Sequence, residues 1–95
     1  MDDLTLTARI RKKPHVTQVV VDQELILLEE TSQTYFGLNT IGAKIWSLFQ
    51  TGTMTLIDLA QYLQKEYQLD EQQSMQDARQ FVEHLLSNHL VYVSD

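Results

Sequence analysis

Histidines and acidic residues are the side chains in this sequence that could hold a metal ion or transfer a proton. The chain has three histidines, His15, His84 and His89. His84 and His89 are five residues apart on a predicted helix, which does not place them on one face, and no acidic residue completes a ligand set around them. Exposed or helix-capping histidines are the simpler interpretation. The sequence therefore predicts no metal site.

The remaining reactive groups give no catalytic arrangement either. The chain has no cysteine, which excludes disulfides, thiolate ligands and thiol nucleophiles. The acidic pairs Glu29-Glu30 and Asp70-Glu71 are typical of a strand end and of a helix start, where the helix dipole favours negative charge. Gly37 and Gly42 belong to no phosphate-binding glycine motif. Because no nucleophile, base or carboxylate pair is positioned, we expect a protein that is not an enzyme and uses no cofactor.

The charge is distributed unevenly along the chain. Four of the seven basic residues are Arg9, Arg11, Lys12 and Lys13, whereas residues 14–95 hold three basic and eleven acidic residues, a net charge of −8. A body of this charge repels nucleic acid, so a basic or neutral partner is expected. The basic cluster is most simply a solvated arm, and docking to an acidic patch on a partner enzyme is the alternative.

Size and composition predict one small globular domain. The chain has 95 residues, of which 43% are hydrophobic, and we assign residues 1–95 to a single domain. No apolar run approaches the ~20 residues that span a bilayer. The N-terminus, Met1-Asp2-Asp3, is acidic where a signal peptide would be basic. We therefore expect a cytoplasmic protein with no membrane partner.

The first part of the chain has the patterns of extended structure. Residues Leu4, Leu6, Ala8 and Ile10 alternate with polar residues, which predicts an extended N-terminal arm over 1–14 that ends at Pro14. Three apolar segments with short connections follow, at 16–21, 25–28 and 34–38. The second is apolar throughout and is expected to be buried on both faces. These segments predict a three-stranded antiparallel β-meander.

The second part of the chain predicts three helices. Asn39, Thr55 and Asp70 are N-cap residues, and Gly52 ends the first helix. The third helix has an apolar stripe with Phe81 beside it. Residues 90–93 form a short strand or an extended tail. Four aromatic residues are assigned to the core, namely Phe36, Trp46, Phe49 and Phe81. The fold class is α+β and winged-helix-like, with the meander preceding the helices.

Several short motifs occur in the order and spacing of a known family. On the strands they are Ile26-Leu27-Leu28-Glu29 and Thr34-Tyr35-Phe36-Gly37-Leu38-Asn39. On the helices they are Gly42-Ala43-Lys44-Ile45-Trp46 in the first, Thr55, Asp58, Leu59 and Glu66-Tyr67 in the second, and Asp77, Phe81, Leu85, Leu86 and Leu90 in the third and its exit. With the opening Leu6-Thr7-Ala8-Arg9-Ile10, they cover nearly the whole chain. The sequence resembles the PqqD-like family, the recognition elements of ribosomally synthesised and post-translationally modified peptides. It departs from the family pattern at His89, where glycine is common.

The resemblance implies a module that binds the leader of a precursor peptide and presents it to a maturation enzyme. The leader would add as a strand beside the last strand of the meander, under the third helix. The residues expected to contact it are Thr34, Tyr35, Phe36, Gly37 and Leu38 on the strand and Met75, Ala78, Arg79 and Val82 on the helix. For Met75, Ala78 and Val82, plain core packing is an equal alternative. The enzyme would be a leader protease, as in lasso-peptide pathways, or a radical S-adenosylmethionine maturase.

Two other functions compete with this interpretation. A winged-helix DNA-binding regulator is the competing hypothesis, but the third helix carries several acidic residues against one basic residue, Arg79. A structural subunit without a peptide ligand is the third hypothesis.

Overall fold

A computed structural model describes residues 5–94 of the chain. Its elements are β1 (Arg9–Lys12), β2 (Val16–Val21), β3 (Glu24–Glu29), β4 (Thr34–Leu38), α1 (Thr40–Leu48), the 3₁₀ turn η1 (Phe49–Thr51), α2 (Leu56–Tyr67), α3 (Glu71–Ser87) and β5 (Val91–Ser94). The predicted α+β class, with an antiparallel meander followed by three helices, is confirmed.

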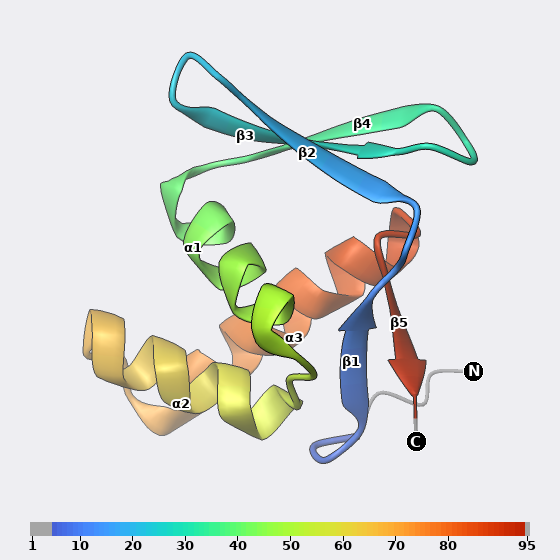
Figure 1. Ribbon diagram of the computed structural model, residues 1–95. Helices are drawn as coiled ribbons and strands as arrows, with labels where there is room; N and C mark the ends of the chain where they lie inside the picture. Colours follow the sequence, from blue (N-terminus) through green and yellow to red (C-terminus); the bar gives the residue numbers. More distant parts are fainter. Residues whose placement is uncertain (1–4, 95) are drawn as a thin grey trace.

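The meander is a sheet in the order β2-β3-β4, lying over the helices with its opposite face uncovered by any described element (Figure 1). Asp22 and Gln23, which join β2 to β3, both have positive φ (52° and 69°), as a two-residue type I′ hairpin turn requires. In β3, Leu27 is fully buried, whereas Ile26 and Leu28 are half-buried. The prediction that this strand is buried on both faces is wrong, because the helices cover only one side of the sheet.

The three helices begin at the predicted caps. The Asn39 side chain accepts a hydrogen bond from the Gly42 N–H (2.7 Å), and the Asp70 side chain accepts one from the Gln73 N–H (2.7 Å). Thr55 forms a capping box with the third residue of α2. These caps satisfy N–H groups that the first helical turn leaves unpaired, so short sequence signals fix the helix starts.

The N-terminal segment is part of the fold, because the Leu6 carbonyl accepts a hydrogen bond from the Ile57 N–H at 3.3 Å and strand β1 begins at Arg9. β1 pairs antiparallel with β5, with Ile10 opposite Val93, and Ile10 also exchanges hydrogen bonds with Met54 at 2.8 and 3.2 Å. Ile10 is fully buried. The predicted arm is therefore held by the C-terminal strand, and its first residues, including Leu4, lie outside the described residues.

The aromatic residues divide into two groups. Trp46 and Phe49 are buried in the core as predicted, and the Trp46 indole N–H donates to Gln18 Oε1 at 2.9 Å. Phe36 and Phe81 are only half-buried, although the sequence assigned them to the core. Both line a groove on the surface of the protein.

The end of α3 also differs from the prediction. The helix ends at Ser87, so His89 follows it and does not share the helix with His84. The His89 N–H bonds to the Leu86 carbonyl (3.1 Å) and the Leu90 N–H bonds to the Leu85 carbonyl (3.0 Å). This is a Schellman motif in which His89 adopts the left-handed conformation (φ 61°) that glycine accepts at least cost.

Candidate peptide-binding groove

The open edge of β4 is defined by the hydrogen-bonding pattern of the sheet. The Glu30 N–H donates to the His15 carbonyl, next to the pair Val16–Glu29. In an antiparallel sheet, the main-chain N–H and C=O groups of successive residues point alternately to the two neighbouring strands. Since Glu30 bonds toward β2, the even-numbered residues of β3 form hydrogen bonds with β2 and the odd-numbered ones with β4. On β4, Phe36 therefore pairs with β3. The N–H and C=O groups of Tyr35 and Gly37 face outward and are free to pair with another strand.

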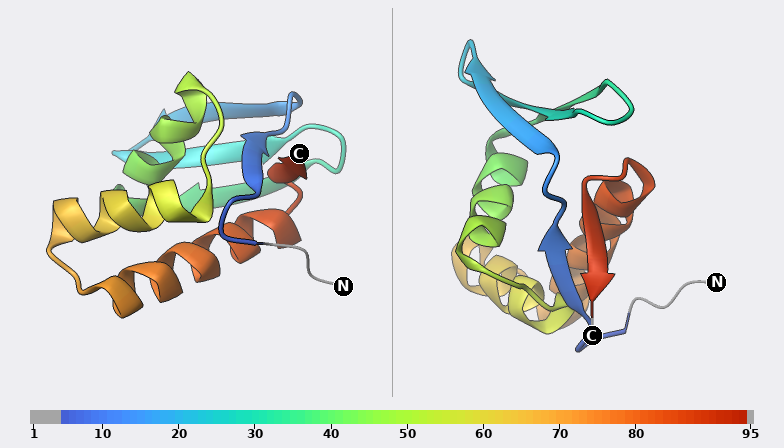
Figure 2. Two further views of the ribbon diagram at one scale, coloured as in Figure 1. Left: turned by 90° about the horizontal axis from the view of Figure 1, so that it is seen from below. Right: turned by 45° about the vertical axis from the view of Figure 1, so that its right-hand side comes forward.

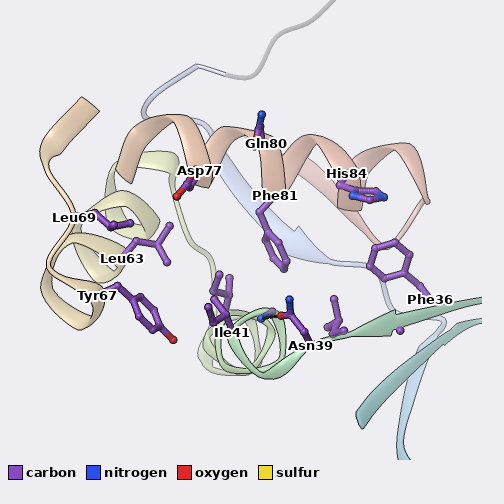
Figure 3. A pocket seen from close by; sticks show the side chains of 14 residues that line it. Phe36, Asn39, Ile41, Leu63, Tyr67, Leu69, Asp77, Gln80, Phe81 and His84 are labelled. Atoms are coloured by element: carbon purple, nitrogen blue, oxygen red, sulfur yellow. Dashed lines mark hydrogen bonds between the residues drawn. The ribbon is translucent and has the colours of Figure 1, made fainter. Parts of the chain in front are cut away.

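This edge borders a groove of about 590 Å³ between β4, the start of α1, the end of α2 and one side of α3. Figure 3 shows side chains from these elements converging on the groove. The lining is mainly apolar, and its residues are Phe36, Gly37, Leu38, Asn39, Ile41, Gly42, Ile45, Leu63, Tyr67, Leu69, Asp77, Gln80, Phe81 and His84.

The floor of the groove depends on Gly42. A Cβ atom at this position would lie 3.2 Å from Leu38 Cδ2 and 3.3 Å from Phe81 Cε1. These separations are tighter than ordinary van der Waals contact. Gly42 therefore lets the first turn of α1 approach both the end of β4 and the Phe81 ring, which points from α3 toward α1 (Figure 3).

Two aromatic rings stand at the β4 end of the groove. Phe36 on β4 and His84 on α3 meet edge to face, with ring centroids 5.1 Å apart and planes at 81°. This geometry suits aromatic rings and connects the strand to the helix across the mouth of the groove. A strand added to β4 would pass beside this pair.

The α2 end of the groove contains polar groups. The Tyr67 hydroxyl is buried and has no hydrogen-bond partner among the described residues. Burial raises the pKa of the neighbouring Tyr62, and Tyr67 and Glu66 add to the effect. Asp77 accepts a hydrogen bond from Gln73 Nε2 at 2.8 Å. A ligand with one polar group could satisfy the Tyr67 hydroxyl, since a buried unpaired hydroxyl is unfavourable.

The predicted strand residues lie where they were expected. Thr34–Leu38 forms the free-edge strand β4. Phe36, Gly37 and Leu38 line the groove, and Tyr35 is exposed on the outer face of the sheet. Thr34 is exposed at the start of the strand and is not among the lining residues.

The helix residues that were predicted to face the cleft lie on other sides of α3. Ala78 and Val82 are fully buried, Met75 is half-buried against the core, and Arg79 is half-buried. None of the four lines the groove. The face of α3 that borders β4 is therefore not the one that the sequence predicted. Ala78 and Val82 follow the core-packing alternative.

The side of α3 that faces the groove carries Asp77, Gln80, Phe81 and His84, which the sequence-based prediction did not include in the site. One available signal pointed to them, because Asp77 and Phe81 belong to the motif that carries the family resemblance. Tyr67 of α2 had the same signal, because it belongs to the family motif of the second helix. Ile41 of α1 gave no separate signal, since it follows the same apolar periodicity as core residues.

No cluster of three histidine or acidic residues that could hold a metal ion occurs within residues 5–94. Over the same residues, no helix has the length and apolar character needed to cross a bilayer.

A comparison with protein-family models matches residues 24–91 to Coenzyme PQQ synthesis protein D (PqqD). The chain belongs to the PqqD family. The match runs from β3 into the first residue of β5 and so includes every element of the groove. Among curated proteins, none matches this chain.

Two solved structures resemble this PqqD-family chain over most of its length. One is TbiB1 in complex with the TbiA(beta) leader peptide, with 30% identity, a TM-score of 0.76, and coverage of 90% of this chain and 99% of that chain. The other is a lasso peptide synthetase B1 complexed with the leader peptide, with 26% identity, a TM-score of 0.74, and coverage of 87% and 96%. Both similar chains are thus structures with leader peptides bound.

Proposed function

We propose that this PqqD-family protein binds the leader region of a ribosomally synthesised precursor peptide by strand addition to β4. The observation that carries the proposal is the free edge of β4, whose outward Tyr35 and Gly37 groups border an apolar groove. Main-chain pairing supplies affinity in this mode, and pockets for alternate side chains supply specificity. The two similar structures with bound leader peptides support it.

The structure suggests how each part of the groove takes part. Tyr35 and Gly37 would exchange main-chain hydrogen bonds with the leader. Phe81 and the apolar lining would take side chains of the leader that point toward the helices. The Tyr67 hydroxyl would pair with a polar group at the far end. The acidic body, with a net charge of −8 over residues 14–95, favours a leader with basic or neutral residues.

The role in this proposal is recognition without catalysis. The bound leader would be presented to a maturation enzyme, either a leader protease of a lasso-peptide pathway or a radical S-adenosylmethionine maturase. The exposed basic residues Arg9 and Arg11 on β1 are candidates for contact with an acidic patch on that enzyme. The lack of cysteine suits a reducing compartment, and we place this step in the cytoplasm.

The proposal is tested by three substitutions on β4. Tyr35→Pro removes an outward N–H, so it should weaken leader binding about tenfold or more while the β3–β4 ladder stays intact. Tyr35→Ala keeps the N–H and removes only an exposed side chain, and is the matched control with little effect. Phe36→Pro removes an inward N–H and should damage the fold itself.

The measurement is calorimetric titration with two synthetic leaders, TbiA(beta) and the leader peptide of the lasso peptide synthetase B1 complex. Circular dichroism of each variant separates loss of binding from loss of fold. Equal binding by Tyr35→Pro and the wild-type protein would contradict strand addition at β4. A wild-type protein that binds neither leader would contradict the proposed function as a whole.

A further inference from the structure

The sheet has a second open edge, β2, on the side away from α3. β2 is the other outer strand of the β2-β3-β4 sheet, as Figure 2 (left) shows. Among the described elements, β3 is the one that packs extensively against it. Edge strands of soluble proteins are usually protected by charges, proline or a bulge. Between Val16 and Val21 this strand has no charged residue and no proline.

The β2 edge is both apolar and able to form hydrogen bonds. Val19, Val20 and Val21 are 54%, 68% and 50% exposed. His15 bonds to Glu30, so the odd-numbered residues of β2 form hydrogen bonds with β3. The N–H and C=O groups of Val16, Gln18 and Val20 therefore point outward. An exposed strand of this kind is a ready template for pairing with another strand.

The charges that flank β2 have opposite signs at its two ends. Lys12 and Lys13 precede the strand, whereas Asp22 follows it in the hairpin turn and Glu24 is the first residue of β3. Glu30 lies behind the lysine end, beyond β3, where its N–H donates to the His15 carbonyl. When two copies of β2 lie antiparallel, the basic end of each copy meets the acidic end of the other. The apolar centres meet in the middle. The strand is therefore complementary to itself in both charge and hydrophobicity.

We propose that a second copy of this chain is the partner of the β2 edge, giving a twofold-symmetric dimer. In a symmetric pair, outward residues must face outward residues, and the register that pairs Gln18 with Val20 places the axis at Val19. The two meanders then form one sheet of six strands. The β4 edges lie at its two ends, so each copy keeps its groove open. Dimerisation and leader binding use opposite edges and do not compete.

Val20→Pro is the substitution that tests the dimer. It removes an outward N–H without interrupting the ladder between β2 and β3, so the fold should persist. Val20→Thr is the matched control, since it keeps the N–H and the β-branched shape. In analytical ultracentrifugation at about 100 µM, the wild-type chain and Val20→Thr should sediment as dimers of the 11.0 kDa chain. Val20→Pro should dimerise at least about tenfold more weakly, because each dimer loses two hydrogen bonds.

The charge complementarity gives an independent test that does not require proline. Glu24→Lys and Lys13→Glu should each weaken the dimer. The double variant should restore it, because the two charges are then exchanged and attract each other again. Raising the salt concentration should weaken the wild-type dimer, since exposed charges are screened. A dimer dissociation constant that changes neither in the two single variants nor with salt would contradict the charge pairing.

The outcomes separate this inference from the proposed function. A wild-type chain that stays monomeric at about 100 µM would overturn the dimer. A folded Val20→Pro variant that dimerises like the wild-type chain would also overturn it. A β2 edge occupied instead by a maturation enzyme, in a complex with one copy of this chain, would do so as well. In each case, titration with the TbiA(beta) leader still reports separately on the β4 groove, and Val20→Pro should bind it as the wild-type protein does.

Discussion

The two long sides of α3 differ in what they pack against. One side carries Ala78, Val82 and Leu85, each fully buried in the core shared with α1 and α2. The other carries Phe81, which is half-buried, and His84, which is exposed, both facing the β4 groove. Under the proposed function, one helix therefore serves stability on one side and recognition on the other. Substitutions on the two sides should have different consequences.

The largest effect is expected on the core side. Val82→Glu places a carboxylate without a partner in a fully buried position, and should destabilise the protein by at least about 4 kcal/mol, enough to unfold a small domain. Thermal denaturation followed by circular dichroism measures the loss. Gln80→Glu, at an exposed position on the same helix, is the control and should change stability little. A stable Val82→Glu variant with a selective loss of leader binding would restore the sequence-based placement of Val82 in the cleft.

On the groove side, Phe81→Ala should separate binding from stability. The ring is half-buried and contacts the region of Gly42, so its removal should cost about 1–2 kcal/mol of stability and leave the protein folded. Leader affinity should fall about tenfold or more, because the apolar lining loses its central ring. Paired calorimetric and thermal measurements check this. An unchanged affinity would show that the leader does not enter the groove beside α3.

At the end of α3, His89→Gly should stabilise the protein by about 1 kcal/mol. His89 holds φ at 61°, a conformation that is unfavourable for a residue with a Cβ atom and natural for glycine. Chemical denaturation is the measurement, and leader affinity should stay the same because His89 lies outside the groove. Asn88→Gly, one residue earlier at an ordinary negative φ of −98°, is the control and should not stabilise.

The smallest effect concerns the turn that leads into β4. Glu29 accepts hydrogen bonds from the Ser32 hydroxyl and backbone and from the Thr31 N–H, which lower its pKa from 4.5 to about 2 against the opposing effect of burial. A lowered carboxyl pKa contributes stability above pH 4.5, and this contribution is lost as the pH falls toward 2. Glu29→Gln should therefore be less stable than the wild-type protein at neutral pH. The difference in melting temperature should shrink between pH 4.5 and 2.

Local signals predicted most of the fold. The caps at Asn39, Thr55 and Asp70 are set by residues within three positions, so the sequence shows them directly. The pairing of β1 with β5 joins segments about 80 residues apart, and no local pattern indicates it. The arm was accordingly predicted without its partner strand.

The sequence predicted the β4 side of the candidate site and not its α3 side. β4 was predicted because residues 34–38 have the pattern of a strand and, with Asn39, also carry a family motif. The groove side of α3 was missed because the apolar stripe shows which residues prefer burial without showing which neighbour covers them. Ala78 and Val82 satisfy that preference in the core, and Phe81 at its margin is left to face β4.

Amide hydrogen exchange, measured by NMR residue by residue with and without the leader, tests the central claim most directly. In the free protein, the Tyr35 and Gly37 N–H groups face solvent and should exchange fast, whereas the Phe36 N–H is already paired with β3 and should exchange slowly. Addition of the leader should slow exchange at Tyr35 and Gly37 and shift the signals of Phe81 and His84. If Tyr35 and Gly37 stay fast at saturating leader, with changes confined to β1, strand addition at β4 is contradicted.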